Sequence, residues 1–376
     1  MKRQSPLLTF TKKLKAHGAF KNNPNKKMIG MVYFKILLSE PFRLLEKKKY
    51  DDVLEHTDPD RAPVFIIGHW RSGTTYTHTL LSQDPGFVYQ TKYQNFFSDN
   101  FLVTEDFFKP FISRTIDFFS PVKQWQSRIS KSMNLDTPSE SDTALISEIS
   151  EYTYHWAHLF PKAYEEYFNK YLFCENLSKQ ELQNWQNTTR TMISKAYLRT
   201  PHGRLLIKNP GDTARIKYLL DIYPDARFVF IHRNPYEVFY SNLKLWTLVQ
   251  QSVAMQQISE DEKKQIVLKV YTKLHQHYLE QKKLLKPHQL IELGFDEISE
   301  KPLQAVEKIY QQLSLQGFDD AYPWIRNFLN EQPPRRNQQY EFKKEDLRLI
   351  NEYWDLAFKQ WNYPKLDPDK ELDEAS

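Results

Sequence analysis

The sequence predicts an α/β fold in three layers, in which helices cover both faces of a central parallel sheet. Four short apolar runs, each followed by a helical pattern, are typical of buried parallel strands and lie at residues 63–67, 204–208, 227–232 and 289–293. Residues 204–232 form a complete strand–helix–strand unit, because the helical spacing of 213–222 ends at Tyr223-Pro224. Such a unit joins two parallel strands by a right-handed crossover.

Further helices are predicted outside this unit. Residues 84–203 are too many for a simple crossover and are rich in Phe, Tyr and helical spacing, so we expect a mostly helical insertion that forms the substrate side. Residues 260–286 and 344–361 also have helical spacing. The expected organisation is a basic helical extension at 1–58, a main domain at 59–366 and an acidic tail at 367–376.

The composition excludes several classes of protein. Cys174 is the only cysteine among the 376 residues, so the chain cannot form an intrachain disulfide or a zinc site of several cysteines, and it fits a reducing compartment such as the cytoplasm. The net charge of +5 suits a small anionic ligand. No motif interleaves basic and aromatic residues, so we expect no nucleic-acid partner.

The N-terminal segment is basic and partly apolar. It lacks the apolar run and cleavage site of a secretory signal. Residues 28–38 are apolar but interrupted by Lys35, and they are fewer than the roughly 20 residues that cross a bilayer. With the lysines before it, residues 21–38 could make peripheral contact with an anionic membrane, or form a helix packed on the domain, which we favour.

A loop directly after the first strand reads Gly68-His-Trp-Arg-Ser-Gly-Thr-Thr75 and precedes a helical segment. A strand, a tight loop and a helix start aim several backbone N–H groups at one point, which creates an anion site. The spacing is that of a P-loop, but Thr74 stands where the lysine of an ATP- or GTP-hydrolysing enzyme should be. The positive charge is carried instead by Arg71 within the loop and by Arg233 after the third strand.

The loop Arg71-Ser-Gly-Thr-Thr75 resembles the 5′-phosphosulfate loop of sulfotransferases that use 3′-phosphoadenylyl sulfate (PAPS). The resemblance implies a P-loop-like fold and a donor site that includes Arg71, Ser72, Gly73, Thr74 and Thr75. In the cytosolic branch of that family a Trp follows the two threonines and stacks on adenine. Tyr76 takes that position here and is able to stack too, less extensively than a Trp.

A second motif, Arg233-Asn-Pro-Tyr-Glu-Val-Phe-Tyr-Ser241, follows the third strand and resembles the family's 3′-phosphate motif. Arg233 ends the strand, Pro235 fits an early helix position, and Ser241 falls about two turns along that helix. Both Arg233 and Ser241 could therefore reach one phosphate. The segments Leu206-Ile-Lys-Asn-Pro210 and Glu292-Leu-Gly-Phe-Asp-Glu-Ile298 resemble pieces of a bacterial-type branch.

The resemblance implies in-line transfer of a sulfuryl group from PAPS to a hydroxyl or amine acceptor, with release of the adenosine bisphosphate PAP. Arg71 and the loop amides would face the charge that builds on the leaving oxygen. Lys208 resembles a lysine that protein-tyrosine sulfotransferases use near the transferring group, with a solvent-facing lysine as the alternative. Arg335-Arg336 could stand in for the basic C-terminal loop of cytosolic members, or be a solvated pair of charges.

The base that removes the acceptor proton is harder to place, because the Lys-x-His-Leu-Pro segment of the cytosolic branch has no match. Glu140 and Asp142 could serve as a carboxylate base, or simply lie in the first turn of a capped helix, which we favour slightly. His78 is interpreted as a packing residue. Glu151, His155 and His158 could imitate a metal triad, but no metal is expected.

Two other functions remain open from the sequence. A nucleotide-dependent phosphotransferase would bind magnesium-ATP, which the missing lysine of the loop speaks against. A catalytically inactive PAP-binding protein would keep the donor site without transferring sulfate. The acceptor of the preferred enzyme could be a small molecule, a lipid or a carbohydrate, and the oligomeric state stays open.

Overall fold

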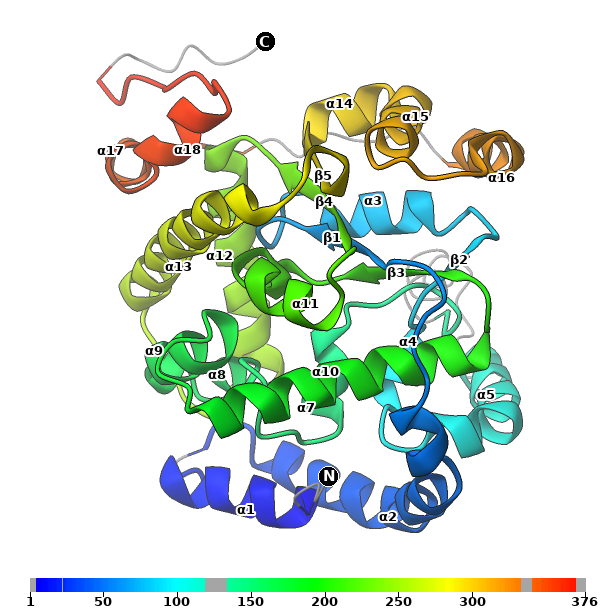
Figure 1. Cartoon of the computed structure of the whole chain (residues 1–376). Coiled ribbons are helices and arrows are strands. Elements are labelled where there is room, and N and C mark those ends of the chain that lie inside the picture. Colours follow the sequence, from blue (N-terminus) through cyan, green and yellow to red (C-terminus); the bar gives the residue numbers. More distant parts are fainter. Residues whose placement is uncertain (1–4, 22, 119–133, 333–339, 370–376) are drawn as a thin grey trace.

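The computed structural model describes residues 5–21, 23–118, 134–332 and 340–369. Its core is a parallel sheet with strand order β2-β3-β1-β4-β5, which confirms the predicted fold class (Figure 1). The strands are β1 (Val64–Ile67), β2 (Phe87–Val88), β3 (Arg204–Lys208), β4 (Arg227–His232) and β5 (Leu290–Gly294). Four of them coincide with the four predicted strands to within a residue. Only β2 is missing from the prediction, because two residues carry no periodicity.

Alternate side chains of the central strands point to opposite faces of the sheet, and each face has its own core. Val64, Ile66 and Val229 pack beneath α3 (Thr74–Leu81), α14 (Phe295–Glu300), α15 (Pro302–Gln312) and α16 (Phe318–Glu331). Phe65 and Phe228 pack on the other face against α10 (Lys179–Arg199), α11 (Ile216–Ile222) and α13 (Glu260–Gln281). Figure 1 shows these two helical layers above and below the sheet.

The C-terminal helical pattern at 344–361 forms two helices rather than one, α17 (Lys344–Tyr353) and α18 (Asp355–Gln360). The break falls at Trp354, whose ring stacks on Tyr271 of α13 at 3.7 Å and whose indole N–H donates to the Leu268 carbonyl at 3.1 Å. The predicted single helix was wrong because these tertiary contacts of a buried Trp turn the chain at that position.

The chain between β2 and β3 is mostly helical and lies beside the sheet. It contains α4 (Lys92–Phe96), α5 (Phe101–Phe118), α7 (Asp142–Ser147), α8 (Trp156–Leu159), α9 (Tyr164–Tyr167), a π-helical turn (Phe168–Leu172) and α10. After β4, the helix α12 (Pro235–Ser252) runs from the sheet toward this region. This helix therefore reaches from the carboxyl edge of the sheet to the lower part of the molecule in Figure 1.

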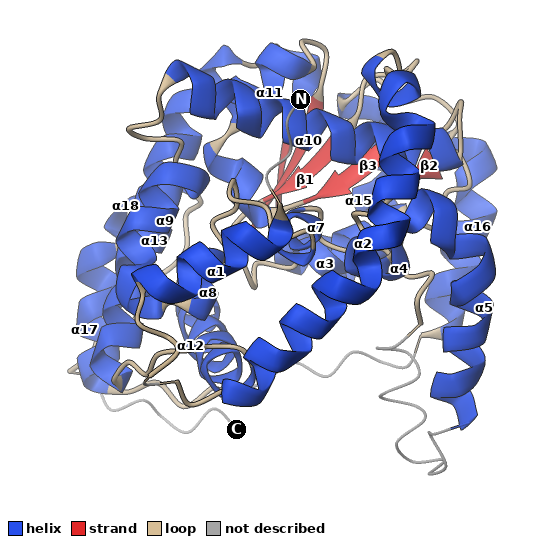
Figure 2. Cartoon of the chain, turned by 90° about the horizontal axis from the view of Figure 1, so that it is seen from below, coloured by secondary structure: helices blue, strands red, loops and turns tan. Residues whose placement is uncertain are grey.

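Two N-terminal helices, α1 (Pro6–Ala16) and α2 (Lys26–Glu55), lie across the underside of the molecule, which Figure 2 presents to the viewer. They are tied to each other by a hydrogen bond of 2.9 Å between Thr11 and Tyr33, and to the insertion by one of 2.6 Å between His17 and Tyr167. The apolar stretch 28–38 thus forms part of a packed helix. None of the helices in the described ranges is both long enough and apolar enough to cross a membrane.

Candidate active site

The loop after β1 has a shape that depends on its two glycines. Gly68 has φ of 135°, and a Cβ there would lie 2.3 Å from the Ile231 carbonyl oxygen. Gly73 has φ of 107°, and a Cβ there would lie 2.1 Å from the Phe295 ring. Both values are positive, in the region that L-residues with side chains rarely adopt. The loop therefore turns tightly and delivers the first-turn N–H groups of α3, which have no partner within the helix, to the carboxyl edge of the sheet.

Neighbouring elements hold this loop in place. The Gly68 N–H donates to the Thr213 hydroxyl at 2.7 Å, and the Ser72 hydroxyl donates to the His69 carbonyl at 2.7 Å. Thr213 belongs to the short 3-10 helix Pro210–Ala214 that follows β3. The sequence analysis missed this contact, because a lone Thr that follows a strand carries no signal of its own.

The two predicted phosphate motifs meet in space. The Arg71 guanidinium donates from Nε to the Ser241 hydroxyl at 2.8 Å, although the two residues are 170 positions apart. Arg233 approaches the Arg71 carbonyl at 3.5 Å and forms an ion pair with Glu237 one turn along α12. The two arginines therefore lie together where β1 and β4 end, which is where open α/β sheets bind their ligands.

Arg233 has further capacity to bind an anion. Its guanidinium lies 4.5 Å from the centre of the Phe295 ring, a geometry in which the ring faces the cation. Its Nε is buried and makes no hydrogen bond to any residue that the structure describes. Tyr76 of α3 meets the same Phe295 ring edge-on at 6.4 Å. Arg335 and Arg336 lie outside the described residues.

Lys208 and Glu140 form an ion pair at the same edge of the sheet. Lys208 ends β3, the parallel neighbour of β1, and its Nζ donates to Glu140 Oε2 at 2.8 Å. The backbone fixes Glu140, because Asn95 Nδ2 donates to its carbonyl at 2.6 Å and the next residue, Ser141, bonds the Lys208 carbonyl at 3.1 Å. Burial alone would raise the pKa of Glu140, but the charge and hydrogen bond of Lys208, together with the nearby His155 and His158, hold that pKa below its ordinary value. Glu140 is therefore ionised at neutral pH.

Asp142 occupies a different environment from Glu140. Its carboxylate accepts from Arg215 Nη2 at 2.7 Å, and Asp212 forms an ion pair with the same nitrogen at 2.9 Å. The Arg215 side chain is fully buried, and burial raises the pKa of Asp212 to about 7. Of the two carboxylates singled out from the sequence, the structure brings Glu140 to Lys208 and takes Asp142 into a buried ion pair.

A polar and aromatic cluster surrounds Glu140. The Tyr154 hydroxyl lies 3.5 Å from Glu140 Oε1 and 3.3 Å from Asn209 Oδ1. His155 and His158 bond each other through their Nδ1 atoms at 3.0 Å. Burial lowers the pKa of His155 to about 4 and that of His158 to about 3, so both rings are neutral at pH 7. Among the described residues, no group of three or more His, Cys, Asp or Glu side chains could hold a metal ion.

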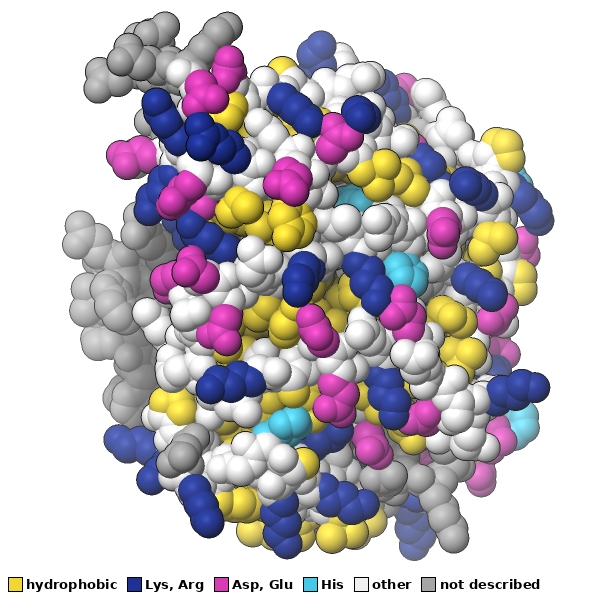
Figure 3. Space-filling model, turned by 90° about the vertical axis from the view of Figure 1, so that its left-hand side faces the viewer, with side chains coloured by type: hydrophobic (Ala, Val, Ile, Leu, Met, Phe, Trp, Pro, Cys, Tyr) yellow, Lys and Arg dark blue, Asp and Glu magenta, His cyan; other side chains and the backbone are white. Residues whose placement is uncertain are grey.

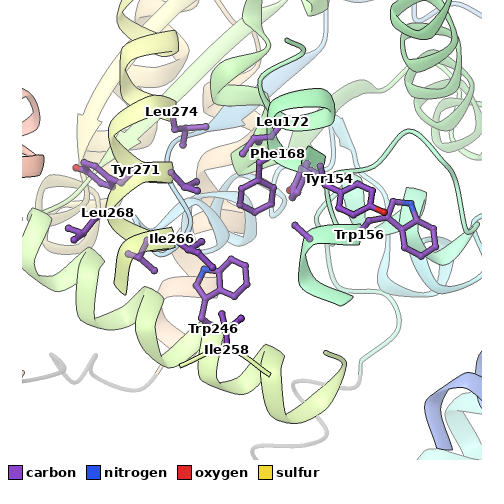
Figure 4. Packing of buried hydrophobic residues seen from close by; sticks show 14 of the residues in the cluster. Tyr154, Trp156, Phe168, Leu172, Trp246, Ile258, Ile266, Leu268, Tyr271 and Leu274 are labelled. Atoms are coloured by element: carbon purple, nitrogen blue, oxygen red, sulfur yellow. The ribbon is translucent and has the colours of Figure 1, made fainter. Parts of the chain in front are cut away.

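Several aromatic rings pack next to this cluster. Trp70 of the phosphate loop meets Tyr154 edge-on at 5.6 Å, and Trp246 of α12 meets His158 at 5.3 Å. Figure 4 shows Trp246 below Phe168 and Tyr154 to the right of Phe168. A small cavity of about 20 Å³, large enough for about one water, lies between Trp70, His158 and Trp246. The surroundings of this cavity are thus mostly apolar.

His78 lies buried on α3, and burial lowers its pKa to about 3. This agrees with its interpretation as a packing residue. Asn209, whose amide bridges Tyr154 and the Gly211 N–H, was missed as a site residue although it follows Lys208 directly. Its position right after a strand-end lysine was the available signal.

Comparison with known proteins decides the family. A family model described as Sulfotransferase family matches residues 63–320 of the chain. The chain belongs to the sulfotransferase family. PAPS is the sulfuryl donor implied for this sulfotransferase by its family, and no metal is required for that chemistry. The expected enzyme class is confirmed, and a phosphotransferase is not supported.

Relatives and solved structures agree with this assignment. The sulfotransferase is 27% identical over 307 residues to omega-hydroxy-beta-dihydromenaquinone-9 sulfotransferase Stf3 of Mycobacterium bovis and of Mycobacterium tuberculosis, which covers 82% of this chain and 76% of each relative. Its fold is similar to that of sulfotransferase STF9 from Mycobacterium avium, with a TM-score of 0.70 at 17% identity, covering 86% of this chain and 82% of that one. Sulfotransferase STF1 from Mycobacterium tuberculosis gives 0.65 at 14% identity, over 93% and 91%.

Proposed function

We propose that the protein transfers a sulfuryl group from PAPS to the hydroxyl of a lipid acceptor, with Glu140 as the general base. The observation that carries the proposal is the Lys208–Glu140 ion pair at 2.8 Å, placed at the carboxyl edge of the sheet where Arg71 and Arg233 also lie. A base, a cation for the transferring group and cations for the donor phosphates are then gathered at one edge.

The donor would be held by the two motifs. The 5′-phosphosulfate would accept from the amides and hydroxyls of the loop, and the 3′-phosphate from Arg233 and Ser241. Arg71 would exchange its bond with Ser241 for a charge-assisted bond to a phosphate oxygen. Tyr76 would lie against adenine. The loop residues assigned to this role are Arg71, Ser72, Gly73, Thr74 and Thr75.

The transfer itself needs one bond formed and one broken. The acceptor oxygen attacks sulfur, the bond between sulfur and the bridging phosphate oxygen breaks, and PAP leaves with the electron pair. The acceptor proton goes to Glu140. When Lys208 turns from Glu140 toward the sulfuryl oxygens, Glu140 loses the cation that lowers its pKa and becomes a stronger base at the moment it is needed.

A lipid acceptor is proposed for two reasons. The small cavity beside the Tyr154–His158 cluster is lined mostly by apolar side chains, among them Trp70, Phe168 and Trp246, which suit an apolar chain better than a sugar. The relative Stf3 carries in its name a hydroxylated menaquinone, an apolar molecule with a terminal hydroxyl. A cytoplasmic location and membrane contact through residues 21–38 belong to the same proposal, since such an acceptor resides in a bilayer.

Labelled PAPS offered to a panel of acceptors tests the proposal. The panel contains a hydroxylated polyprenyl quinone, a polyprenol, a simple phenol, a primary amine and a monosaccharide. Transfer at least tenfold faster to the polyprenyl acceptors is expected. Preference for the sugar or the amine would overturn the lipid assignment, and PAP binding without transfer to any acceptor would favour a binding protein that has lost turnover.

A further inference from the structure

The outward face of α2 has an unusual composition. Its most exposed residues in the middle of the helix are Met31, Phe34, Leu37 and Leu38, at 70%, 68%, 65% and 61% exposure. About two turns further on, Leu44 and Leu45 are also more than half exposed. A helix that covers a water-soluble domain normally turns such residues inward and its charges outward. Here large apolar residues follow one another along the solvent face.

The charged residues of the same stretch point the other way. Lys35 donates to the Ser147 carbonyl at 2.7 Å, and Glu46 is buried, where it accepts from the Leu102 N–H at 2.7 Å and pairs with Lys195. Arg43 is held by Glu40 at 2.5 Å. The charged side chains in the middle of α2 therefore point into the protein or pair with each other, and its outer face is apolar. This is the reverse of the usual pattern for a surface helix, and packing within the chain does not explain it.

A neighbouring helix extends this face. Phe42 of α2 meets Phe108 of α5 edge-on at 5.4 Å, and Phe107 and Phe111 of α5 are 80% and 69% exposed. Figure 2 shows α2 crossing the face turned to the viewer, with α5 at its right-hand edge. The exposed side chains together form the α2–α5 surface, made of Met31, Phe34, Leu37, Leu38, Leu44, Leu45, Phe107, Phe108 and Phe111. Apolar groups gathered to this extent mark an interaction site.

Basic residues border the α2–α5 surface at both ends of α2. Lys26 and Lys27 are exposed before the apolar stretch, and Lys48 and Lys49 are exposed after it. Figure 3 shows yellow hydrophobic and dark blue basic side chains together along the lower edge of the molecule, where α1 and α2 lie in Figure 1. The carboxylates within 26–49 are Glu40 and Glu46, and each is paired with a cation. Asp51 and Asp52 follow only beyond the second pair of lysines.

We propose that the α2–α5 surface docks this enzyme on an anionic lipid membrane. An apolar centre that enters the acyl boundary, flanked by lysines that reach the headgroups, is the composition of an interfacial helix. A second copy of the chain fits less well, because lysines stand at both ends of the apolar stretch. Two such helices paired in either direction would therefore bring lysines against lysines.

The surface is physically linked to the catalytic edge. Asn25, which precedes α2, donates from Nδ2 to the Ala254 carbonyl at 2.6 Å, just beyond the end of α12. The same α12 carries Ser241 of the donor motif and Trp246, which meets His158 beside the small cavity. The inference deepens the proposed function, on which it rests for the lipid acceptor: docking would bring a bilayer to one end of the helix that carries part of the donor site.

Flotation of the full-length protein with vesicles tests the docking. One set of vesicles is pure phosphatidylcholine and the other contains about 30% phosphatidylglycerol, an amount high enough to give a strongly negative surface. The wild type should float with the anionic vesicles. Phe34→Glu/Leu38→Glu and Lys26→Glu/Lys27→Glu should each lower the partition coefficient about tenfold or more. The matched controls should float like the wild type: Leu284→Glu/Trp324→Glu, which changes similarly exposed apolar residues elsewhere, and Lys283→Glu/Lys301→Glu.

Two further measurements separate this inference from the proposed function. PAP affinity in solution should be the same in the wild type and in Phe34→Glu/Leu38→Glu, since the donor site lies on other elements, and this equality also reports that the variant is folded. Equal flotation of all variants, or no flotation of the wild type, would overturn membrane docking while leaving the donor site untouched. A wild-type dimer that becomes monomeric in Phe34→Glu/Leu38→Glu would assign the surface to a second copy instead.

Discussion

Replacing Glu140 by Gln separates its proposed role as a base from its role as a partner of Lys208. A general base contributes about 10²- to 10⁴-fold to the rate, so kcat should fall by that factor, equivalent to about 3–5 kcal/mol in the barrier. The Gln carbonyl oxygen can still accept from the Lys208 ammonium, so the free energy of unfolding should fall by only about 1 kcal/mol. Glu140→Ala removes the partner of Lys208, whose side chain is only 6% exposed. This variant should lower the free energy of unfolding by about 3 kcal/mol.

The assay is single-turnover transfer of labelled sulfuryl from PAPS to the best acceptor, measured from pH 3.5 to 9. In the wild type the rate should decline on the acid side as the carboxylate is protonated, and in Glu140→Gln this decline should vanish with the activity. Asp142→Asn is the matched control, two residues away. Because Asp142 pairs with Arg215, this variant should lose stability, while the folded fraction keeps the pH profile. A Glu140→Gln enzyme with kcat within threefold of the wild type would refute the assignment.

Further expectations concern the donor loop, a glycine and acid stability. Arg71→Ala and Arg233→Ala should each weaken PAP binding by about 2–3 kcal/mol, or roughly 30- to 150-fold, because each removes a charge-assisted phosphate contact; unchanged calorimetric affinity in both would contradict the donor site. Gly73→Ala should lower the melting temperature and PAP affinity together, since φ is 107° and the methyl would meet Phe295; an unaltered melting curve would show that the loop tolerates a side chain. The pKa of Glu140 is lowered in the folded protein, so its stabilisation is complete above the ordinary value of 4.5 and is lost as the pH falls below it; denaturant titrations at pH 3.5 and 7 should reveal this loss in the wild type and a smaller one in Glu140→Gln.

The strands and the donor motifs could be predicted because their signals are local. Buried parallel strands are continuous apolar runs, and the runs at 63–67 and 227–232 stand out from their polar surroundings. The phosphate loop is equally local, since its glycines and Arg71 fall within six residues of one another. The hydrogen bond between Arg71 and Ser241 was not predicted, but it agrees with the topology, because β1 and β4 are parallel neighbours and both motifs leave from the same edge.

The distinction between Glu140 and Asp142 could not be predicted, because it depends on distant partners. Glu140 meets Lys208 and Asp142 meets Arg215, and both cations lie about 70 positions further along the chain. Although they are only two positions apart, Glu140 lies at the sheet edge and Asp142 lies in the core. The orientation of α2 was left open for a related reason. The sequence allowed residues 21–38 either to contact a membrane or to pack on the domain, and only the packing reveals that Phe34 and Leu38 lie on the side away from the domain.

A structure of the PAP complex would test the central claim most directly, namely that two motifs far apart in the sequence form one donor site beside the Lys208–Glu140 pair. The account predicts the 5′-phosphate within hydrogen-bond distance of the amides of residues 71–75 and the 3′-phosphate on Arg233 and Ser241. The bond between Arg71 and Ser241 should be replaced by bonds to the nucleotide. A complex in which PAP binds elsewhere, or in which that bond persists and the 3′-phosphate faces solvent, would contradict the account.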